Sequence, residues 1–135
     1  MTRNEAREKM MQILYELDVT DSLNEEKAVK LASERLPGDH ANRGGSLLCQ
    51  IIADLEDIDA DINRCATKWK TSRMPKVDLS IMRLAVGEMK YCDDIPDAVS
   101  VNEAINLGRK FSTEHSARFI HGVLGAVSKK EHPDE

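Results

Sequence analysis

The sequence predicts one all-α domain of six to seven helices. Apolar residues recur along most of the chain at the three- and four-residue steps of an amphipathic helix. No segment alternates with period two for long, and no dipeptide marks a hairpin. The 135 residues are close to the commonest size of a single domain, and a 41% apolar composition supports one core. We therefore expect one helical domain over residues 1–130 and a disordered tail over residues 131–135.

Capping signals introduce the first two expected helices. Thr2 and Glu5 have the spacing of a capping box. One amphipathic stripe follows them: Ala6, Met10, Ile13, Leu14 and Leu17. Ser22 and Glu25 repeat the capping signal before a second stripe. The Pro-Gly-Asp segment at residues 37–39 should end the second helix, because proline removes a donor and glycine permits positive φ.

A third apolar stripe runs from Leu48 to Trp69 in alternating steps of three and four residues. A coiled-coil seam has this spacing over three heptads. Further apolar residues beside the seam widen the stripe, which favours a helix of a globular bundle. We therefore predict one long helix whose apolar face is closed by Trp69.

The segment at residues 77–91 carries apolar side chains on two adjacent stripes, so it should be the central helix of the bundle. Four residues remain as a candidate solvent-exposed edge: Ser80, Arg83, Gly87 and Lys90. Ser100 and Glu103 form a further capping box before the next stripe. Ser112 and Thr113 are expected to cap the final helix.

Several classes of protein do not fit this composition. No apolar stretch approaches the roughly 20 residues of a membrane span, and no hydrophobic signal core follows Met1. We therefore expect a soluble cytoplasmic protein with no membrane partner. The three cysteines are odd in number and lack a CxxC pair, which argues against a disulfide framework or zinc site. Common catalytic motifs are missing, so the sequence predicts no enzyme activity, no cofactor and no metal site.

Charge is distributed unevenly, although the net charge of −5 by itself weakens a nucleic-acid hypothesis. The segment 54–61 holds five acids and no base. Its spacing is not that of an EF-hand loop, so we interpret it as the solvated face of a helix. The segment 64–76 holds five bases and no acid, with Trp69 between Lys68 and Lys70. That alternation suits stacking on nucleic acid, whereas the apolar stripe assigns Trp69 to the core.

Short motifs follow one another along nearly the whole chain. They are Arg3-x-x-Ala6-Arg7 with Ile13-Leu14-Tyr15, Ile58-Asp59-x-x-Ile62, Trp69-x-x-x-Arg73-Met74, Val77-Asp78-x-x-Ile81-Met82-Arg83-Leu84-Ala85-x-x-Glu88, Ile95-Pro96, Val101-Asn102-Glu103-Ala104, Phe111-Ser112 and Phe119-Ile120-His121-Gly122-Val123-Leu124. In this order and spacing the chain resembles the NusB family of transcription antitermination factors. Only the stretch from about residue 20 to 41 is nondescript.

The resemblance implies a seven-helix fold with two subdomains and a non-enzymatic adapter. Proteins similar to this one bind the boxA element of nascent RNA together with NusE, a small-subunit ribosomal protein. Their complex joins the elongating RNA polymerase and other Nus factors. It suppresses premature termination, notably on ribosomal RNA operons.

The resemblance also implies candidate site residues. Six match RNA-binding positions of the family: Arg3, Arg7, His115, Arg118, Phe119 and Gly122. Tyr15, Asp78 and Arg83 fall where the family meets the ribosomal protein or keeps its subdomains together. Single-stranded RNA requires cations for its phosphates and an aromatic face for a splayed base. Phe119 suits either that role or core packing.

Two departures from the family pattern lower the expected RNA affinity. Asn4 and Glu5 interrupt the arginine-rich start, and His121 stands where the family has asparagine. Each lost phosphate contact weakens binding and flattens its salt dependence. We therefore expect weak RNA binding alone and stronger binding with the ribosomal partner.

Two other functions remain open. Some RNA-modifying enzymes carry a related helical RNA-binding domain before a methyltransferase domain. No SAM-binding domain follows Lys130, so this chain would be only a fragment of such an enzyme. The heptad-like seam and the acidic net charge instead suit a helical protein-interaction module, or a homodimer, with little RNA affinity.

Overall fold

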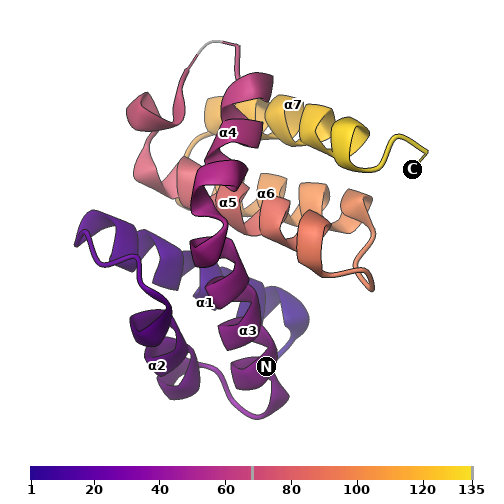
Figure 1. The fold of residues 1–135 in the computed structure, drawn as a ribbon. Helices are drawn as coiled ribbons and strands as arrows, with labels where there is room; N and C mark the ends of the chain where they lie inside the picture. Colours follow the sequence, from indigo (N-terminus) through magenta and orange to yellow (C-terminus); the bar gives the residue numbers. More distant parts are fainter. Residues whose placement is uncertain (68, 135) are drawn as a thin grey trace.

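The computed structural model describes residues 1–67 and 69–134, and every regular element within these ranges is helical. Lys68 of the basic segment and Glu135 of the expected tail lie outside the described residues. The elements are α1 (Arg3–Val19), α2 (Glu25–Arg35), α3 (Asp39–Ala53), α4 (Leu55–Cys65), the short 3-10 helix η1 (Thr71–Arg73), α5 (Lys76–Tyr91), α6 (Asp97–Phe111) and α7 (Glu114–Glu131). The predicted all-α fold is confirmed (Figure 1). None of the described helices is long and apolar enough to cross a membrane.

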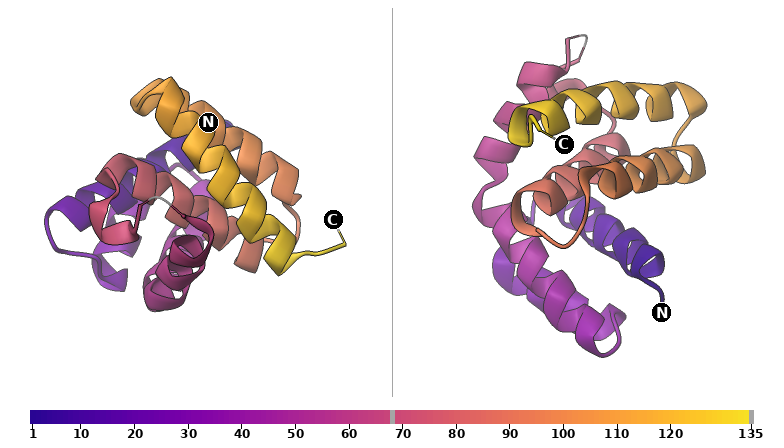
Figure 2. Two further views of the ribbon diagram at one scale, coloured as in Figure 1. Left: turned by 90° about the horizontal axis from the view of Figure 1, so that it is seen from above. Right: turned by 90° about the vertical axis from the view of Figure 1, so that its right-hand side faces the viewer.

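Two groups of helices share α5 as their common centre. Helices α1 to α3 pack together on one side, and α4, α6 and α7 lie on the other (Figures 1 and 2). Helix α5 contacts α1, α3, α4, α6 and α7, and each residue from Asp78 to Met89 is buried. This is the two-subdomain arrangement that the resemblance implied, with α5 as the central helix that its two apolar stripes predicted.

Two of the four expected helix caps are present. The Thr2 hydroxyl accepts a hydrogen bond from the Glu5 amide, and the Glu5 carboxylate accepts one from the Thr2 amide. Thr113 caps α7 by accepting from the Ser116 amide. Both pairs satisfy amides that the first helical turn leaves unpaired.

The other two expected caps are wrong. Helix α2 is capped by Asn24, whose side chain accepts from the Lys27 amide, and not by Ser22. Helix α6 begins at Asp97 directly after a proline. Ser100 therefore lies inside the helix, where its buried hydroxyl donates to Glu88 at 2.8 Å. A capping pattern in sequence cannot distinguish a helix start from a serine that bonds to another helix.

The predicted single helix from Leu48 to Trp69 is also wrong, because it breaks at Asp54. This residue ends α3 and precedes α4, with ψ at 22°. The apolar steps continue across the break, so periodicity alone does not reveal it. After the break α4 packs against α5 and α7 and ends at Cys65, four residues before Trp69.

The predicted solvated acidic face is present only in part. Asp54, Glu56 and Asp57 are exposed, whereas Asp59 and Asp61 face other helices. Asp61 is 6% exposed and pairs with Arg64 and, at 2.8 Å, with Lys90. Asp59 accepts two hydrogen bonds from Arg83. Asp59 and Asp61 therefore attach α4 to α5 by ion pairs.

The predicted solvent-exposed edge of α5 is wrong at three of its four positions. Ser80, Arg83 and Gly87 are buried, and Lys90 is half-buried between Asp61 and Glu131. The polar groups tolerate burial because each has a partner, such as the Lys76 carbonyl for the Ser80 hydroxyl.

Helix α7 runs to Glu131, one residue past the expected boundary of the domain. The Glu131 carboxylate accepts a hydrogen bond from Lys90 at 2.8 Å, and the His132 ring lies 2.8 Å from an oxygen of Asp97. These contacts hold the end of α7 against α5 and α6. Disorder of residues 131–135 as a whole stays a prediction.

We predict opposite effects for the same substitution at two helical glycines. A Cβ at Gly87 would lie 2.4 Å from Ile51, which is fully buried and has no free space to move into. Gly87→Ala should therefore lower the free energy of unfolding by about 1–3 kcal/mol. A Cβ at Gly125 would meet nothing within 4 Å.

Gly125→Ala is the matched control and should raise stability by up to about 1 kcal/mol through helix propensity. Urea denaturation followed by circular dichroism measures both effects. A Gly87→Ala protein as stable as the control would contradict the close contact between α3 and α5.

Candidate nucleic-acid interface

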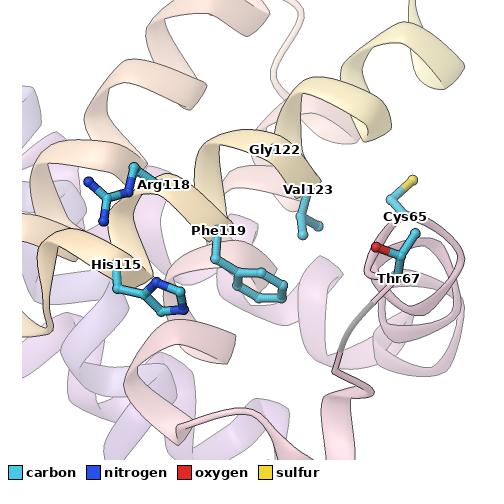
Figure 3. A pocket seen from close by; sticks show the side chains of 7 residues that line it. All are labelled: Cys65, Thr67, His115, Arg118, Phe119, Gly122 and Val123. Carbon is cyan, nitrogen blue, oxygen red and sulfur yellow. The ribbon is translucent and has the colours of Figure 1, made fainter.

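An open hollow of about 400 Å³ lies where the first half of α7 faces the end of α4 and the loop after it. It is lined by Cys65, Thr67, His115, Arg118, Phe119, Gly122 and Val123 (Figure 3). Beside it the Trp69 ring packs on Phe119 with centroids 5.4 Å apart, and on His115 at 6.4 Å with the rings edge to face. We call this site the aromatic hollow. It combines three ring systems with a cation at its rim.

The predicted place of Trp69 as the end of an apolar helix face is wrong. Trp69 lies in the loop beyond α4 and is 37% exposed. Phe119 is partly buried and packs against the hydrophobic core while also lining the hollow. The packing half of the expectation for Phe119 is therefore met, and its ring is also open to a ligand in the hollow. The base–aromatic alternation at residues 68–70 was the signal that pointed to Trp69.

Arg118 and Gly122 shape the rim of the aromatic hollow. Arg118 is exposed, extends away from the Phe119 ring (Figure 3), and makes no hydrogen bond or ion pair within residues 1–67 and 69–134. A Cβ at Gly122 would meet nothing within 4 Å, so packing does not require glycine there. The missing side chain leaves the α7 backbone open to a ligand next to Phe119.

Two further hollows continue from this one. Arg118 also lines a hollow of about 530 Å³ between α6 and α7. That hollow shares Glu103 and Asn106 with a third, of about 300 Å³, between α1 and α6. Arg7 and Lys110 lie on the third. We call the three together the furrow; it runs from the aromatic hollow over α7 and α6 to the start of α1.

The two N-terminal arginines have different surroundings. Arg3 is exposed and donates to Asp94 at 2.7 Å, and Arg43 pairs with the same carboxylate at 2.9 Å. These two hydrogen bonds, that from Arg43 foremost, hold the pKa of Asp94 well below its usual range. Arg3 thus lies at the surface, as a phosphate contact requires, although it is engaged by Asp94.

Arg7 is buried, which corrects the expectation that it is a surface residue free to touch phosphates. It is 5% exposed. Its Nε donates to Glu88 at 2.8 Å, and a terminal nitrogen donates to Asn4 at 2.6 Å. The other Glu88 oxygen accepts from Ser100. Arg7 therefore joins α1 to α5 beneath the end of the furrow.

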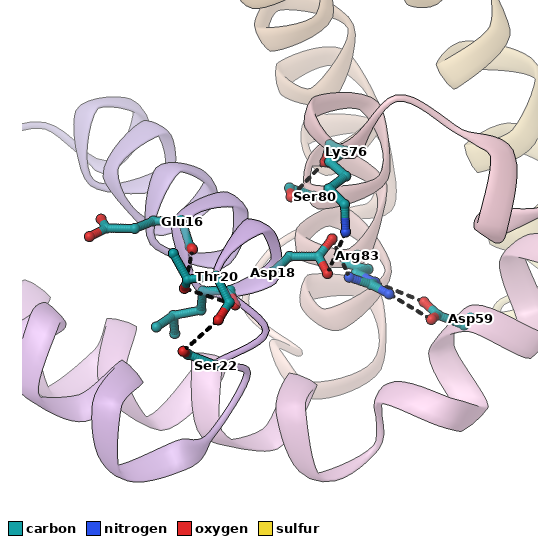
Figure 4. Close-up of polar contacts among 9 residues, drawn as sticks. Glu16, Asp18, Thr20, Ser22, Asp59, Lys76, Ser80 and Arg83 are labelled. Atoms are coloured by element: carbon teal, nitrogen blue, oxygen red, sulfur yellow. Dashed lines mark hydrogen bonds and ion pairs between the residues drawn. The ribbon is translucent and has the colours of Figure 1, made fainter.

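The three residues assigned to the protein partner also differ in their exposure to solvent. Tyr15 on α1 is 37% exposed, so it is open to a partner. Arg83 is 6% exposed; it donates to Asp59 at 2.7 and 2.9 Å and to Asp18 at 3.3 Å (Figure 4). Arg83 joins α1, α4 and α5. Its burial speaks against a direct contact with the partner and favours its other assigned role, holding the subdomains together.

Asp78 is fully buried in the first turn of α5. Its carboxylate is therefore not at the surface, where a direct contact with the partner would require it. Neither of its carboxylate oxygens has a hydrogen-bond partner among residues 1–67 and 69–134. A carboxylate near a helix N-terminus is favoured by the helix dipole.

The described residues contain no group of three or more histidine, cysteine or acidic side chains placed to hold a metal ion. Residues 4–129 match the sequence model of the NusB family. The chain belongs to the NusB family. Members of this family are transcription antitermination factors rather than enzymes.

Relatives and solved structures agree over almost the full length. The Transcription antitermination protein NusB of Bacillus mycoides is 42% identical over 128 residues, which cover 94% of this chain and 97% of that protein. The protein of the same name from a Thermoanaerobacter species is 38% identical, with 100% and 96% covered. The structure of NusB from T. maritima superposes with a TM-score of 0.87 at 26% identity, covering 96% of this chain and 92% of that one.

A fourth likeness concerns the fold. A crystal structure of the antitermination factors NusB and NusE in complex with double-stranded RNA matches with a TM-score of 0.81 at 23% identity. It covers 96% of this chain and 99% of that chain. The seven-helix architecture is thus shared with that protein.

We predict that the two N-terminal arginines differ in their effect on stability. Arg7→Ala leaves the Glu88 carboxylate buried without its cation, which should lower the free energy of unfolding by about 3–5 kcal/mol. Arg3→Ala removes only a surface ion pair and should stay within about 0.5 kcal/mol of the wild type. Chemical denaturation at neutral pH compares the two variants, and equal stability would contradict the buried role of Arg7.

Proposed function

We propose that this protein is a transcription antitermination adapter that binds boxA-type single-stranded RNA together with the ribosomal protein NusE. In this proposal the complex joins the elongating RNA polymerase and other Nus factors in the cytoplasm and supports transcription of ribosomal RNA operons. The observation that carries the proposal is the aromatic hollow, where Trp69 packs on Phe119 and the exposed Arg118, which makes no ion pair within residues 1–67 and 69–134, lies at the rim.

The chemistry of the aromatic hollow fits a single strand. Single-stranded RNA is bound by stacking its splayed bases on aromatic rings while cations contact its phosphates. Trp69 offers an exposed ring, Phe119 a ring anchored in the core, and Arg118 an exposed guanidinium. The furrow then offers a path across α7 and α6 for the nucleotides that follow.

The cationic surface beside the furrow is weak, which supports the proposal that RNA is bound together with a protein partner. Arg109 pairs with Glu114, and Lys110 with Glu8, so two bases near the furrow are already neutralised. The net charge of −5 further weakens the attraction of the chain for phosphate. The structural neighbour solved with NusE and RNA shows that a protein of this fold assembles with both. Exposed Tyr15 is the residue that we assign to the partner contact.

A titration of labelled boxA RNA at two salt concentrations, with and without NusE, tests the proposal. We expect weak binding by the protein alone and markedly tighter, salt-sensitive binding with NusE. Tight binding without any gain from NusE would contradict the partner role. NusE binding with no RNA binding in either setting would instead indicate a protein-interaction module, and self-association without RNA or NusE binding would indicate a homodimer.

We predict that Trp69→Ala weakens boxA RNA binding by about fivefold to a hundredfold, because one stacked base contributes about 1–3 kcal/mol. Trp69→Phe keeps a ring and should retain most of the affinity. The exposed ring adds little to the core, so the melting temperature should change little. Fluorescence anisotropy measures the affinities; a loss of folding in place of a loss of binding would assign Trp69 to the core after all.

A further inference from the structure

The hollow between α6 and α7 is lined by polar side chains that the structure leaves without partners. Asn102, Glu103, Asn106 and His121 line it and make no hydrogen bond or ion pair within residues 1–67 and 69–134. Three of them are exposed, and Glu103 is half-buried. At about 530 Å³ the hollow is larger than the aromatic hollow beside it.

Helical spacing brings these groups to one face. Asn102 and Asn106 are four residues apart on α6, and Glu103 and Asn106 are three apart, so each pair shares a side of the helix. Arg118 and His121, three apart on α7, line the other wall. The two walls therefore present hydrogen-bonding groups to the same space.

The combination of groups differs from that of a phosphate site. A phosphate needs donors and positive charge, whereas Glu103 supplies only acceptor oxygens. Asparagine amides supply both donors and acceptors, and carboxylates accept from the amino groups of bases. The edges of RNA bases carry donors and acceptors together, and unstacked bases expose those edges. A base edge is thus the ligand that this set of groups matches.

The place of the hollow favours RNA over a protein segment. It adjoins the aromatic hollow through Arg118, which lines both. Because the two hollows share Arg118, a strand that stacks on Trp69 and Phe119 would pass Arg118 on its way to the α6–α7 hollow. The nucleotides beyond the stack would then face Glu103 and Asn106.

We propose that the α6–α7 hollow reads the edges of RNA bases, with Glu103 and Asn106 as specificity-determining residues. The proposal rests on the RNA binding proposed above and adds a division of labour. The aromatic hollow binds any base by its face, and Arg118 contacts the backbone of any sequence. The α6–α7 hollow distinguishes one base from another.

The test compares boxA RNA with a shuffled RNA of the same composition, each titrated against the complex with NusE. Glu103→Gln and Asn106→Ala should each lower the ratio of the two affinities by about fivefold to a hundredfold. Binding of the shuffled RNA should fall by less than binding of boxA RNA for Asn106→Ala. It should be unchanged or tighter for Glu103→Gln, which removes a negative charge from the RNA path.

Arg118→Ala is the matched control on the opposite wall of the hollow. It should weaken both RNAs equally, leave their ratio unchanged, and flatten the log–log salt slope by about 0.7, the contribution of one phosphate contact. Thermal melting checks that all three variants fold.

Three outcomes would overturn the proposal. The affinity ratio could remain at its wild-type value in both α6 variants, or the variants could weaken NusE binding in the absence of RNA, which would assign the hollow to the protein. Equal affinity of the wild-type complex for both RNAs would also reject base reading while leaving RNA binding intact. If the wild-type complex binds neither RNA, the proposed function itself fails.

Discussion

The burial of α5 on all sides is the constraint on which the rest of the structure depends. A helix in this position carries charged side chains into the interior, and pairing offsets the cost of burying Arg83 and Glu88. The buried Asp78 carboxylate lies instead in the first turn, where the helix dipole favours it. Arg83 is paired by α1 and α4, and Glu88 by α1 and α6. The surrounding helices are therefore fixed both by apolar packing and by ion pairs that converge on α5.

Internal ion pairs do not remove the acidity of the chain. Asp59, Asp61 and Glu88 each pair with a base of another element or turn. Acids and bases are therefore taken up together, and the net charge of −5 remains on the rest of the chain. Affinity for phosphate depends on local arrangement, and at the aromatic hollow the exposed Arg118 makes no ion pair within residues 1–67 and 69–134.

Much of the fold was predictable because apolar periodicity reports directly on which helix faces are buried. It placed α1, α5 and α7 and identified α5 as central. It missed the break at Asp54, because the apolar steps continue through it and the break consists of a change in backbone angles at one residue. Ser22 and Ser100 failed for a related reason: a hydroxyl that could cap a helix locally can also bond elsewhere or leave the cap to a neighbour.

The candidate site was predictable only in part. The residues of α7 came from the resemblance, and the structure brings His115, Arg118, Phe119 and Gly122 to one hollow. Trp69 could not be placed, since its position depends on where α4 ends. Arg7 and Arg83 carry the same charge as surface arginines, and only the tertiary structure shows that both point inward. The furrow combines the consecutive helices α6 and α7 with α4 and α1, which are distant in sequence, so no local pattern could reveal it.

The seat of Ile51 against Gly87 has a mechanical consequence. The Ile51 side chain of α3 occupies the space that a side chain at position 87 of α5 would otherwise fill. The two helices are therefore interlocked at this point. If α3 moved along α5, the Ile51 side chain would collide with the larger side chains of the neighbouring turns of α5. The contact therefore fixes the register of α3 on α5, the helix that both groups of helices share.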